Sequence, residues 1–202
     1  MLAVAILAAG ESRRMGEPKA LLPYRGSTFL GHLIEVTRHP RVGITRIVLG
    51  AGAEAIQAKL QLDPETIVIN AEWSRGQLSS IQAAIRSLPP GITEGLILCP
   101  VDHPLVSATL VGQLIAQFDA AKKSIVLPTY HGRRGHPVIF PHSMYEELLK
   151  ASPGVGARQV VWAHADAVVP VPTEEEAVVL NLNDPESLKL AMGKPKSGDR
   201  RT

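Results

Sequence analysis

The chain has 202 residues, 45% hydrophobic and 4% aromatic, and its 21 Lys and Arg against 19 Asp and Glu leave a formal net charge of +2. This length suits a single α/β domain with a core of aliphatic residues and alanine. The charge close to zero favours neither nucleic acid nor an anionic membrane as a partner, and no apolar run has the length that spans a bilayer.

The first residues and the one cysteine indicate where the protein works. No basic segment precedes the short apolar run at residues 3–7, so we expect no signal peptide and a cytoplasmic protein. Cys99 is the sole cysteine, which excludes an internal disulfide and a cysteine-based zinc site. Because Cys99 lies in an apolar run, we expect its thiol to be a buried packing group.

Strand-like and helix-like segments alternate through the first part of the chain. The predicted strands are residues 3–7, 46–49, 66–69, 96–99 and 125–127. The predicted helices are residues 29–37, a segment through Ile56 and Leu60, 77–88 and 110–121. This alternation is typical of βαβ units, and strands that are apolar throughout indicate a mostly parallel sheet with helices on both faces.

Beyond residue 128 the pattern is looser. Short strands are predicted at residues 138–140, 167–171 and 178–180, and short helices at 144–149 and 158–162. Asp184 followed by Pro185 and Glu186 is a good helix start, and we expect this helix to end near Leu190. Residues 193–202 are rich in Lys, Arg, Gly, Ser and Pro, which predicts a disordered basic tail behind a domain of residues 1–192.

The most informative segment is AVAILAAGESRRMGEPKALLP, residues 3–23. A predicted strand breaks into small residues and then into a polar loop with two arginines and a lysine. Small residues let the backbone approach a ligand closely, and the basic side chains suit a triphosphate. The segment therefore predicts a strand that ends in a phosphate-binding loop. Its glycines fit neither G-x-G-x-x-G nor a Walker A motif, and the alternative is a plain glycine-rich turn with solvated basic residues.

The pattern L-A-A-G-x-S-x-R-M-G-x-x-K-x-L-L-P closely resembles the opening of nucleotidyltransferases that make molybdenum cofactor dinucleotides. The resemblance extends to about Leu190 and implies a Rossmann-like α/β fold of the nucleotide-diphospho-sugar transferase type. It implies that Arg14 and Lys19 neutralise the charge of a bound triphosphate, whereas Arg13 fills a variable position. The nucleotide-binding residues that it implies in this loop are Leu7, Ala8, Ala9, Gly10, Arg14, Gly16 and Lys19.

Asp102 follows the predicted strand at residues 96–99. In open α/β sheets the ligand lies beyond the carboxyl ends of the strands, and a carboxylate there suits Mg²⁺. The resemblance places Asp102 on the Asp of a D-x-P motif and so implies a catalytic metal ligand, whereas the alternative is the cap of a turn. His103 stands where the family often has Met or Gln; it is either a substrate contact or a solvated histidine.

The resemblance implies a second metal ligand but offers two candidate residues for it. Related cytidylyltransferases often show D-x-D-T-P-E-D where this chain has Asn181 and Asn183 at the two Asp positions. An amide oxygen still ligates Mg²⁺, with less charge. Asn181 and Asn183 are therefore both candidate ligands, and the choice between them stays open.

Two further segments complete the resemblance. NAEWSRGQLSSI, residues 70–81, resembles N-x-x-W-x-x-G-[ML]-x-x-S-[LVI] and implies nucleotide contacts for Asn70, Gly76 and Ser80; a serine-capped helix is the alternative. RGHPV, residues 134–138, matches the family G-H-P-V and implies acceptor contacts for His136 and Pro137, where a packed turn is the alternative.

Three histidines near this segment suggest a zinc site, but the spacing of His131, His136 and His142 fits no usual zinc motif. Gly154 stands where the family pattern G-D-x-G-A-R has Asp, which puts the family's catalysis or acceptor choice in question here.

The implied reaction is attack of an acceptor phosphate on the α-phosphorus of a nucleoside triphosphate, with Mg²⁺ as cofactor and pyrophosphate as product. Leu7, Ala8, Ala9 and Gly10 replace the L-A-G-G of guanylyl-transferring relatives, and the extra methyl favours CTP over GTP. The implied acceptor is molybdopterin and the implied client a molybdenum hydroxylase. Two alternatives stay open: a non-catalytic molybdenum-cofactor binding or insertion protein, and a nucleotidyltransferase for a sugar, polyol or other small phosphate.

Overall fold

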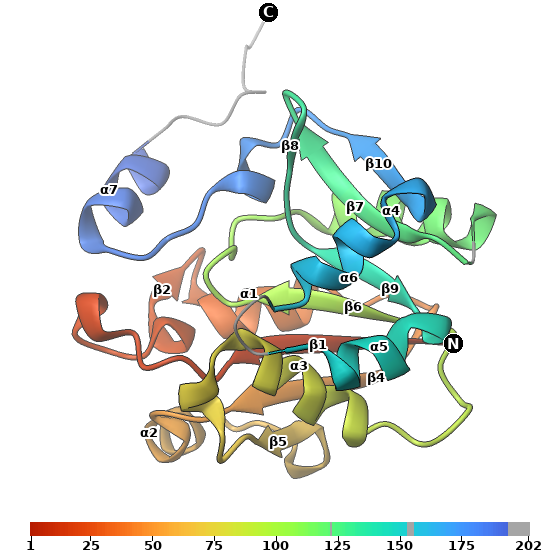
Figure 1. Ribbon diagram of the computed structural model, residues 1–202. Coiled ribbons are helices and arrows are strands. Elements are labelled where there is room, and N and C mark those ends of the chain that lie inside the picture. The colour runs from red at the N-terminus through yellow and green to blue at the C-terminus, as the bar shows by residue number, and fades with distance from the viewer. Residues whose placement is uncertain (122, 153–155, 194–202) are drawn as a thin grey trace, which may run out of the picture.

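The computed structural model of the chain (Figure 1) describes residues 1–121, 123–152 and 156–193. An eight-stranded sheet has the order β10-β7-β9-β6-β1-β4-β5, with β8 paired to β7. The strands are β1 (Leu2–Ala8), β4 (Val42–Leu49), β5 (Ile67–Ile69), β6 (Gly95–Pro100), β7 (Ile125–Tyr130), β8 (Arg133–Arg134), β9 (Val138–Pro141) and β10 (Val168–Pro172), while β2 (Pro23–Tyr24) and β3 (Ser27–Thr28) form a separate hairpin.

The predicted mostly parallel sheet is confirmed. Strand β1 is central and pairs in parallel with β4 and β6, β4 pairs in parallel with β5, and β7 pairs in parallel with β10. Strand β9 runs antiparallel to both β6 and β7, which makes the sheet mixed on one side of β6. The carboxyl ends of β1 and β6 therefore lie side by side at one edge of the sheet.

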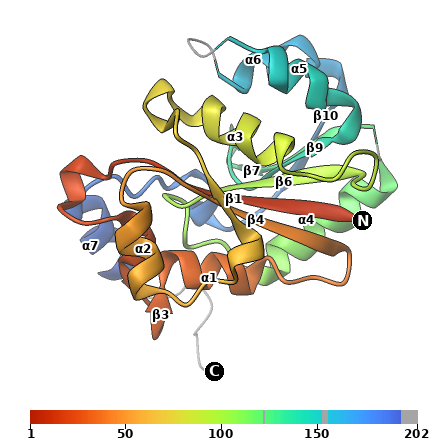
Figure 2. The ribbon, with the colours of Figure 1, turned by 90° about the horizontal axis from the view of Figure 1, so that it is seen from below.

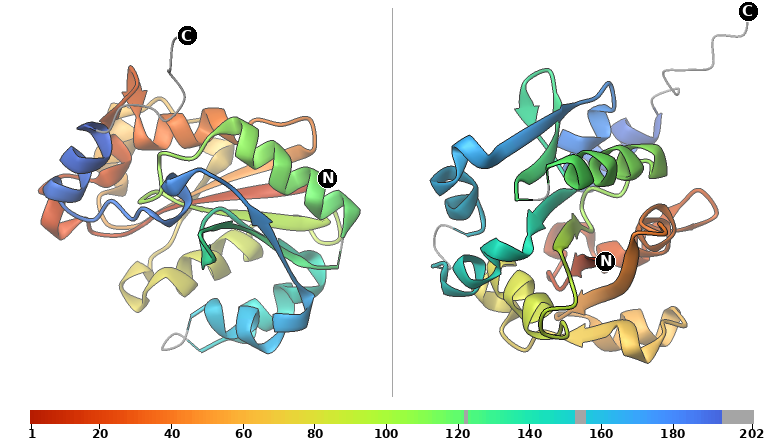
Figure 3. Two further views of the ribbon diagram at one scale, coloured as in Figure 1. Left: turned by 90° about the horizontal axis from the view of Figure 1, so that it is seen from above. Right: turned by 90° about the vertical axis from the view of Figure 1, so that its right-hand side faces the viewer.

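Helices cover both faces of the sheet. Figure 2 shows α1, α2 and α4 on one face and α3, α5 and α6 on the other, and the left view of Figure 3 shows the same division. The helices are α1 (Phe29–Val36), α2 (Ala53–Lys59), α3 (Gln77–Arg86), α4 (Ala108–Ala120), α5 (Tyr145–Lys150), α6 (Arg158–Ala163) and α7 (Pro185–Gly193). Short 3-10 turns occur at Arg13–Met15, Lys19–Leu21, Pro64–Thr66, Trp73–Arg75, His142–Met144, Ala165–Ala167 and Glu176–Val179.

Strand β1 explains why a continuously apolar sequence predicts a central strand. All seven of its residues are buried. Val4 and Ile6 pack in the core beneath α1 and α4, whereas Ala5 and Leu7 pack in the core beneath α3. Successive side chains of a strand point to opposite faces, so a strand covered on both faces needs an apolar residue at every position.

The predicted elements are found with shifted ends, apart from one strand. Residues 178–180 were expected to be a strand, and this expectation is wrong: Glu176–Val179 is a 3-10 turn. Val178 is fully buried and its carbonyl accepts a hydrogen bond from the backbone N–H of His136. The apolar residues here belong to a turn that packs on the core. A short apolar run fits such a turn as well as it fits a strand, so the sequence alone does not separate the two.

The end of the chain agrees in part with expectation. Helix α7 extends to Gly193, a little beyond the predicted end at Leu190. Residues 194–202, which make up most of the predicted tail, and Gly154 lie outside the described residues, so the division into a domain and a tail stays a prediction. Within the described part of the chain, no helix has both the length and the apolar character needed to cross a membrane.

A pair of glycine substitutions tests the packing of the sheet. A Cβ on Gly95 in β6 would lie 2.7 Å from Cζ of Phe118 and 2.9 Å from the carbonyl oxygen of Phe140. We expect Gly95→Ala to lower the free energy of unfolding by about 1–3 kcal/mol, because overpacking strains the core. In α4, a Cβ on Gly112 would have no neighbour within 4 Å, so Gly112→Ala should raise that free energy by about 0.5–1 kcal/mol. Urea unfolding measures both, and equal stability of the two variants would contradict this account.

Candidate functional site

A cavity of about 430 Å³ lies where β1 and β6 end. Its wall includes most of the residues predicted in the first loop: Leu7, Ala8, Ala9, Gly10, Arg14 and Lys19. Gly16 is not part of the wall, but its φ of 75° is the left-handed conformation that glycine adopts easily, and it turns the loop. Arg13 also lines the cavity, yet its side chain is 81% exposed and pairs with Glu11.

The loop after β1 curls back so that Lys19 faces the end of β6. Ser12, with φ 54°, precedes the 3-10 turn Arg13–Met15, and its hydroxyl accepts a hydrogen bond from the backbone N–H of Lys19 at 3.0 Å. This contact closes the loop on itself. The basic side chains of Arg14 and Lys19 are thereby presented to one cavity from a single short segment.

Lys19 joins three distant parts of the chain. Its Nζ donates a hydrogen bond to Oδ1 of Asn183 and lies 3.9 Å from Oδ2 of Asp102. The Lys19 side chain is only 11% exposed, and this burial lowers its pKa. The charge of Arg14 acts in the same direction, whereas Asp102 and Asp184 oppose the shift. The ammonium group thus lies in a partly desolvated place between two of the three predicted metal ligands, Asp102 and Asn183.

Asp102 and Asn183 offer oxygen atoms to a cation in this cavity. Nζ of Lys19 and Nε2 of His103 each lie 3.9 Å from a carboxylate oxygen of Asp102. Asn183 lines the cavity, whereas Asn181 is exposed and lies outside it. One carboxylate and one amide fit Mg²⁺, which takes one or two protein ligands and completes its shell with phosphate oxygens and water.

Binding of a cation in this cavity would depend on ligands from a bound substrate. The described residues contain no group of three or more His, Cys, Asp or Glu side chains able to hold a metal ion by themselves. A divalent ion at Asp102 would therefore share its coordination with the phosphates that it accompanies.

The start of α3 forms another part of the wall. Gly76 and Ser80 line the cavity, as predicted for residues near a nucleotide, together with Trp73. Asn70 does not line it: Nδ2 of Asn70 donates to the hydroxyls of Ser79 and Ser80 at 2.9 and 3.0 Å. Asn70 is 5% exposed, so within this structure it positions the start of α3 and does not face the cavity.

A second cavity of about 570 Å³ adjoins the first. The two share Leu7, Gln77 and Pro100 as wall residues. His136 lines the second cavity, and Pro137 is buried behind it. The residues predicted for the nucleotide and those predicted for the acceptor thus line or lie behind two adjoining cavities, and their roles stay predictions.

The loop that carries His136 depends on a glycine. A Cβ on Gly135 would lie 2.4 Å from the carbonyl oxygen of Val178, so only glycine permits this approach. The backbone N–H of His136 donates to that same carbonyl at 2.9 Å. Gly135 therefore fixes the position of His136 against the turn Glu176–Val179.

The rings of His103 and His136 are in contact, with their centroids 4.7 Å apart and their planes tilted by 50°. Burial lowers the pKa of His136 to about 3, with a smaller contribution from His103. Burial also lowers the pKa of His103, which Asp102 opposes. His103 is 8% exposed, so the alternative of a solvated histidine is wrong. This pair of neutral imidazoles was missed in the sequence because the two residues are far apart along the chain.

Residues 4–168 match the model of the MobA-like NTP transferase domain. The chain belongs to this family. The resemblance seen in its opening loop is thereby confirmed, and with it the membership of a nucleotidyltransferase family.

Named relatives span several activities. The nicotine blue oxidoreductase of Paenarthrobacter nicotinovorans is 35% identical over 161 residues, which cover 76% of this chain and 78% of that protein. The bifunctional protein GlmU of Azotobacter vinelandii is 31% identical over 139 residues, which cover 65% of this chain. The match covers only 30% of GlmU, so the chain corresponds to a part of that protein.

Solved structures share the fold over nearly the whole chain. Rv0371c from Mycobacterium tuberculosis H37Rv superimposes with a TM-score of 0.81 at 26% identity and covers 96% of this chain and 99% of that one. A complex of Rv0371c with manganese superimposes with a TM-score of 0.73 at 25% identity, covering 96% of this chain and 99% of that one. Molybdopterin-guanine dinucleotide biosynthesis protein A from Archaeoglobus fulgidus has a TM-score of 0.66 at 20% identity, covers 94% of this chain and 96% of that one, and shows the fold alone.

The buried imidazole of His136 makes a prediction for acid stability. Its pKa is about 3 in the folded chain and near 6.5 when unfolded, so the unfolded chain binds the proton more tightly. Above pH 6.5 the ring is neutral in both states and the folded chain keeps its full stability. As the pH falls from 6.5 towards 3, the unfolded chain takes up the proton and the free energy of unfolding decreases. Between pH 7 and pH 5 we expect the free energy of unfolding of the wild type to fall by on the order of 2 kcal/mol more than that of His136→Gln.

Urea unfolding at a series of pH values measures this difference. His131→Asn replaces an exposed histidine and serves as the control, which should follow the wild type. If His136→Gln loses stability with the same slope as the wild type, His136 is not a neutral buried ring.

Proposed function

We propose that this chain is a Mg²⁺-dependent nucleotidyltransferase that moves CMP from CTP onto a phosphate of a molybdopterin-type acceptor and releases pyrophosphate. The observation that carries the proposal is the place of Lys19, beside Asp102 and Asn183, in a cavity that shares a wall with a second one. A molybdenum hydroxylase is the client that such a product would serve.

The first cavity suits a triphosphate. Arg14 and Lys19 supply positive charge from the loop after β1, and the start of α3 presents backbone N–H groups beside Gly76. Phosphoryl transfer needs positioning and neutralisation of charge more than covalent chemistry. The low exposure of Lys19 strengthens its attraction for phosphate, because charges interact more strongly away from water.

Asp102 and Asn183 would hold Mg²⁺ with the phosphates of the substrate. When bound, the ion would supply neutralisation of the charge that develops on the phosphate oxygens. Asn183 is the better second ligand because it lines the cavity and Asn181 does not. The manganese complex of Rv0371c supports a divalent cation in this family.

The shared wall supports direct transfer. An acceptor in the second cavity would present its phosphate across Leu7, Gln77 and Pro100 towards the α-phosphorus in the first. His136 would meet this acceptor as a neutral ring, because burial holds its pKa far below neutral. In-line attack needs the acceptor phosphate on the side of the α-phosphorus opposite to the departing pyrophosphate, and an adjoining cavity allows this approach.

Ala9 supports the choice of CTP. Ala9 is 4% exposed, lines the first cavity, and its carbonyl accepts a hydrogen bond from the backbone N–H of Ala51 at 3.0 Å. In this proposal the methyl group of Ala9, on a loop held to its neighbour, leaves less room for the base than a glycine would. The larger purine of GTP would need that space, although one methyl group discriminates by only about 10-fold.

The relative at 35% identity supports a second candidate, an oxidoreductase. That relative's name denotes a redox activity, and this chain resembles it over about three quarters of both lengths. A cavity that holds a nucleotide would then hold a dinucleotide reductant, and the second cavity its oxidised substrate. Two other candidates are a carrier that binds cofactor without transfer and a transferase for a sugar or polyol phosphate.

The test of the proposed function is pyrophosphate release with Mg²⁺, molybdopterin and each of CTP, GTP, ATP and UTP in turn. We expect release with CTP and a loss of at least about 100-fold in Asp102→Ala. Asn183→Ala should weaken release, whereas the matched Asn181→Ala should leave it near the wild-type rate.

Other results identify the other candidates. Binding without release under every combination would favour the carrier, and release with a sugar or polyol phosphate would favour that acceptor class. Oxidation of NADH or NADPH in the presence of a quinone, with no pyrophosphate release, would favour the oxidoreductase.

Lys19 makes a prediction about the pH profile of transfer. Its lowered pKa means that the free enzyme loses the ammonium below the ordinary lysine value of 10.5. We expect kcat/KM to fall on the alkaline side before pH 10.5, because kcat/KM reports groups of the free enzyme. Lys19→Arg should move this fall to higher pH, since guanidinium stays charged, and an unmoved profile would contradict the role of Lys19.

A further inference from the structure

Gln77 differs from the other residues that border both cavities. Leu7, Gln77 and Pro100 line the first cavity and also the second. Leu7 and Pro100 are buried and apolar, whereas Gln77 is exposed and carries an amide. Of these three side chains, only the amide of Gln77 is able to form hydrogen bonds with ligands on both sides.

The place of Gln77 follows from the turn of helix α3. Gly76 and Ser80, at the start of this helix, line the first cavity. Leu78 and Ile81 line the second. Each residue of an α-helix is rotated by about 100° from the residue before it, and this rotation puts Gln77 between the two faces. The start of α3 thus lies between the cavities, with Gln77 along the edge that borders both.

The side chain of Gln77 has rotamer freedom to lose when a ligand binds. It is exposed, and it belongs to the first residue of α3. Side chains of a helix tilt towards its N-terminal end, which here faces the cavities. Fixing a glutamine side chain in one rotamer costs conformational entropy. Once one ligand has fixed the amide, a second ligand does not meet that cost again.

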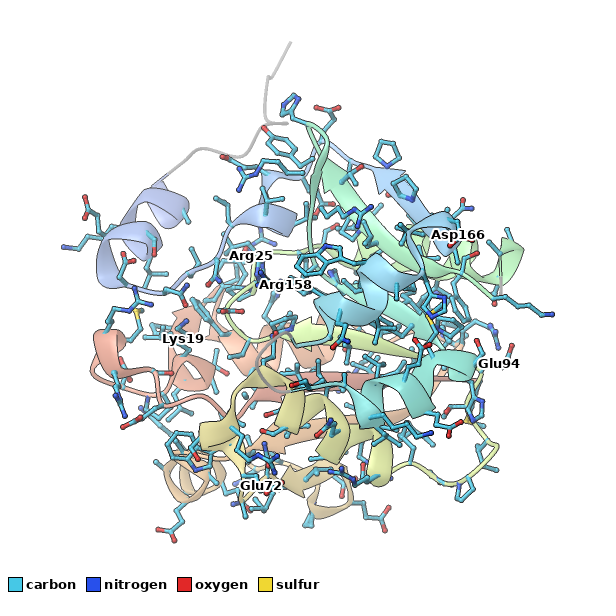
Figure 4. All side chains as sticks on the ribbon, in the orientation of Figure 1. Lys19, Arg25, Glu72, Glu94, Arg158 and Asp166 are labelled. Carbon is cyan, nitrogen blue, oxygen red and sulfur yellow. The ribbon has the colours of Figure 1, made fainter. Side chains whose placement is uncertain are left out.

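An amide at this position is a departure from the pattern N-x-x-W-x-x-G-[ML]-x-x-S-[LVI]. Gln77 occupies the place of Met or Leu. Neither of those side chains offers an N–H, whereas the amide nitrogen of glutamine has two N–H donors. Anionic oxygen atoms are suitable acceptors, because a positive side chain lines each cavity: Figure 4 labels Lys19 from the first wall and Arg158 from the second.

We propose that Gln77 couples the two cavities. One N–H of its amide donates to a phosphate oxygen of the nucleotide in the first cavity, and the other donates to an anionic oxygen of the ligand in the second. Each ligand therefore raises the affinity for the other, by the same factor in both directions. The inference rests on the proposed function only for the identity of the two ligands.

Anaerobic calorimetry measures this coupling without turnover. One ligand is Mg²⁺ with α,β-methylene-CTP, a nucleotide that cannot transfer CMP, and the other is molybdopterin. Each is titrated into the free protein and into protein saturated with the other. We expect each ligand to raise the affinity for the other about fivefold or more. Gln77→Met keeps the size of the side chain and loses its donors, so this factor should fall below about twofold.

Two further variants separate the hydrogen bonds from other effects. Gln77→Glu keeps the length and polarity of the side chain without its N–H donors, and it should lose the coupling as well. Gln113→Met makes the same exchange as Gln77→Met at an exposed position of α4 outside both cavities, and it should couple the ligands as the wild type does. Circular dichroism checks that each variant is folded.

Independent binding of the two ligands to the wild type, or coupling that persists in folded Gln77→Met, would overturn the inference. The proposed function fails separately. Coupling that is lost in Gln77→Met, with no pyrophosphate release under any condition, would remove the transferase and leave the inference standing. Pyrophosphate release by a wild type that binds the two ligands independently would keep the transferase and remove the inference. A wild type that binds molybdopterin neither alone nor with the nucleotide would contradict both.

Discussion

The buried ammonium of Lys19 is the constraint on which the site depends. A charge that is 11% exposed is costly unless oxygen atoms surround it, and Asn183 and Asp102 provide them. These three residues come from the loop after β1, the loop after β6 and the segment before α7. The requirement to solvate one side chain thus brings together parts of the chain that the sheet alone would leave apart.

The segment from residue 173 to residue 183 connects the two cavities. Leu182 donates its backbone N–H to the carbonyl of Asp102 at 2.9 Å, and the carbonyl of Val178 accepts from His136. Near its start, Glu175 accepts a hydrogen bond from the backbone N–H of Ser107 at 3.1 Å. A shift of this segment would move His136 and Asn183 together, so the geometry of both cavities depends on one stretch of chain that lies outside the α-helices and the main sheet.

The sequence predicts those features that are encoded locally. Strand β1 is recognisable because seven apolar residues in a row suit a strand covered on both faces. Helix α3 is recognisable by its apolar period, and the loop between β1 and α1 by its small and basic residues. The motifs also indicate the family, since the positions of Arg14, Lys19 and Asp102 follow a recognisable spacing.

Features that depend on contacts between distant residues were not predictable in this way. Asn70 belongs to a motif, but its side chain donates hydrogen bonds to Ser79 and Ser80. These partners are set by the packing of α3 against β5, which the motif does not encode. The contact between the rings of His103 and His136 requires the loop after β6 and the loop before β9 to meet. The place of Arg158 and Trp162 in the wall of the second cavity depends on where α6 packs, which the local sequence does not indicate.

The wall that the two cavities share has a consequence for inhibitor design. Leu7, Gln77 and Pro100 line both cavities, so the two cavities adjoin each other. A compound that joins a nucleotide to a second ring through a short linker would occupy both at once, and its second contact would form at an effective concentration in the millimolar range. Such a compound would bind more tightly than either half, and it would discriminate against enzymes that have only the nucleotide half.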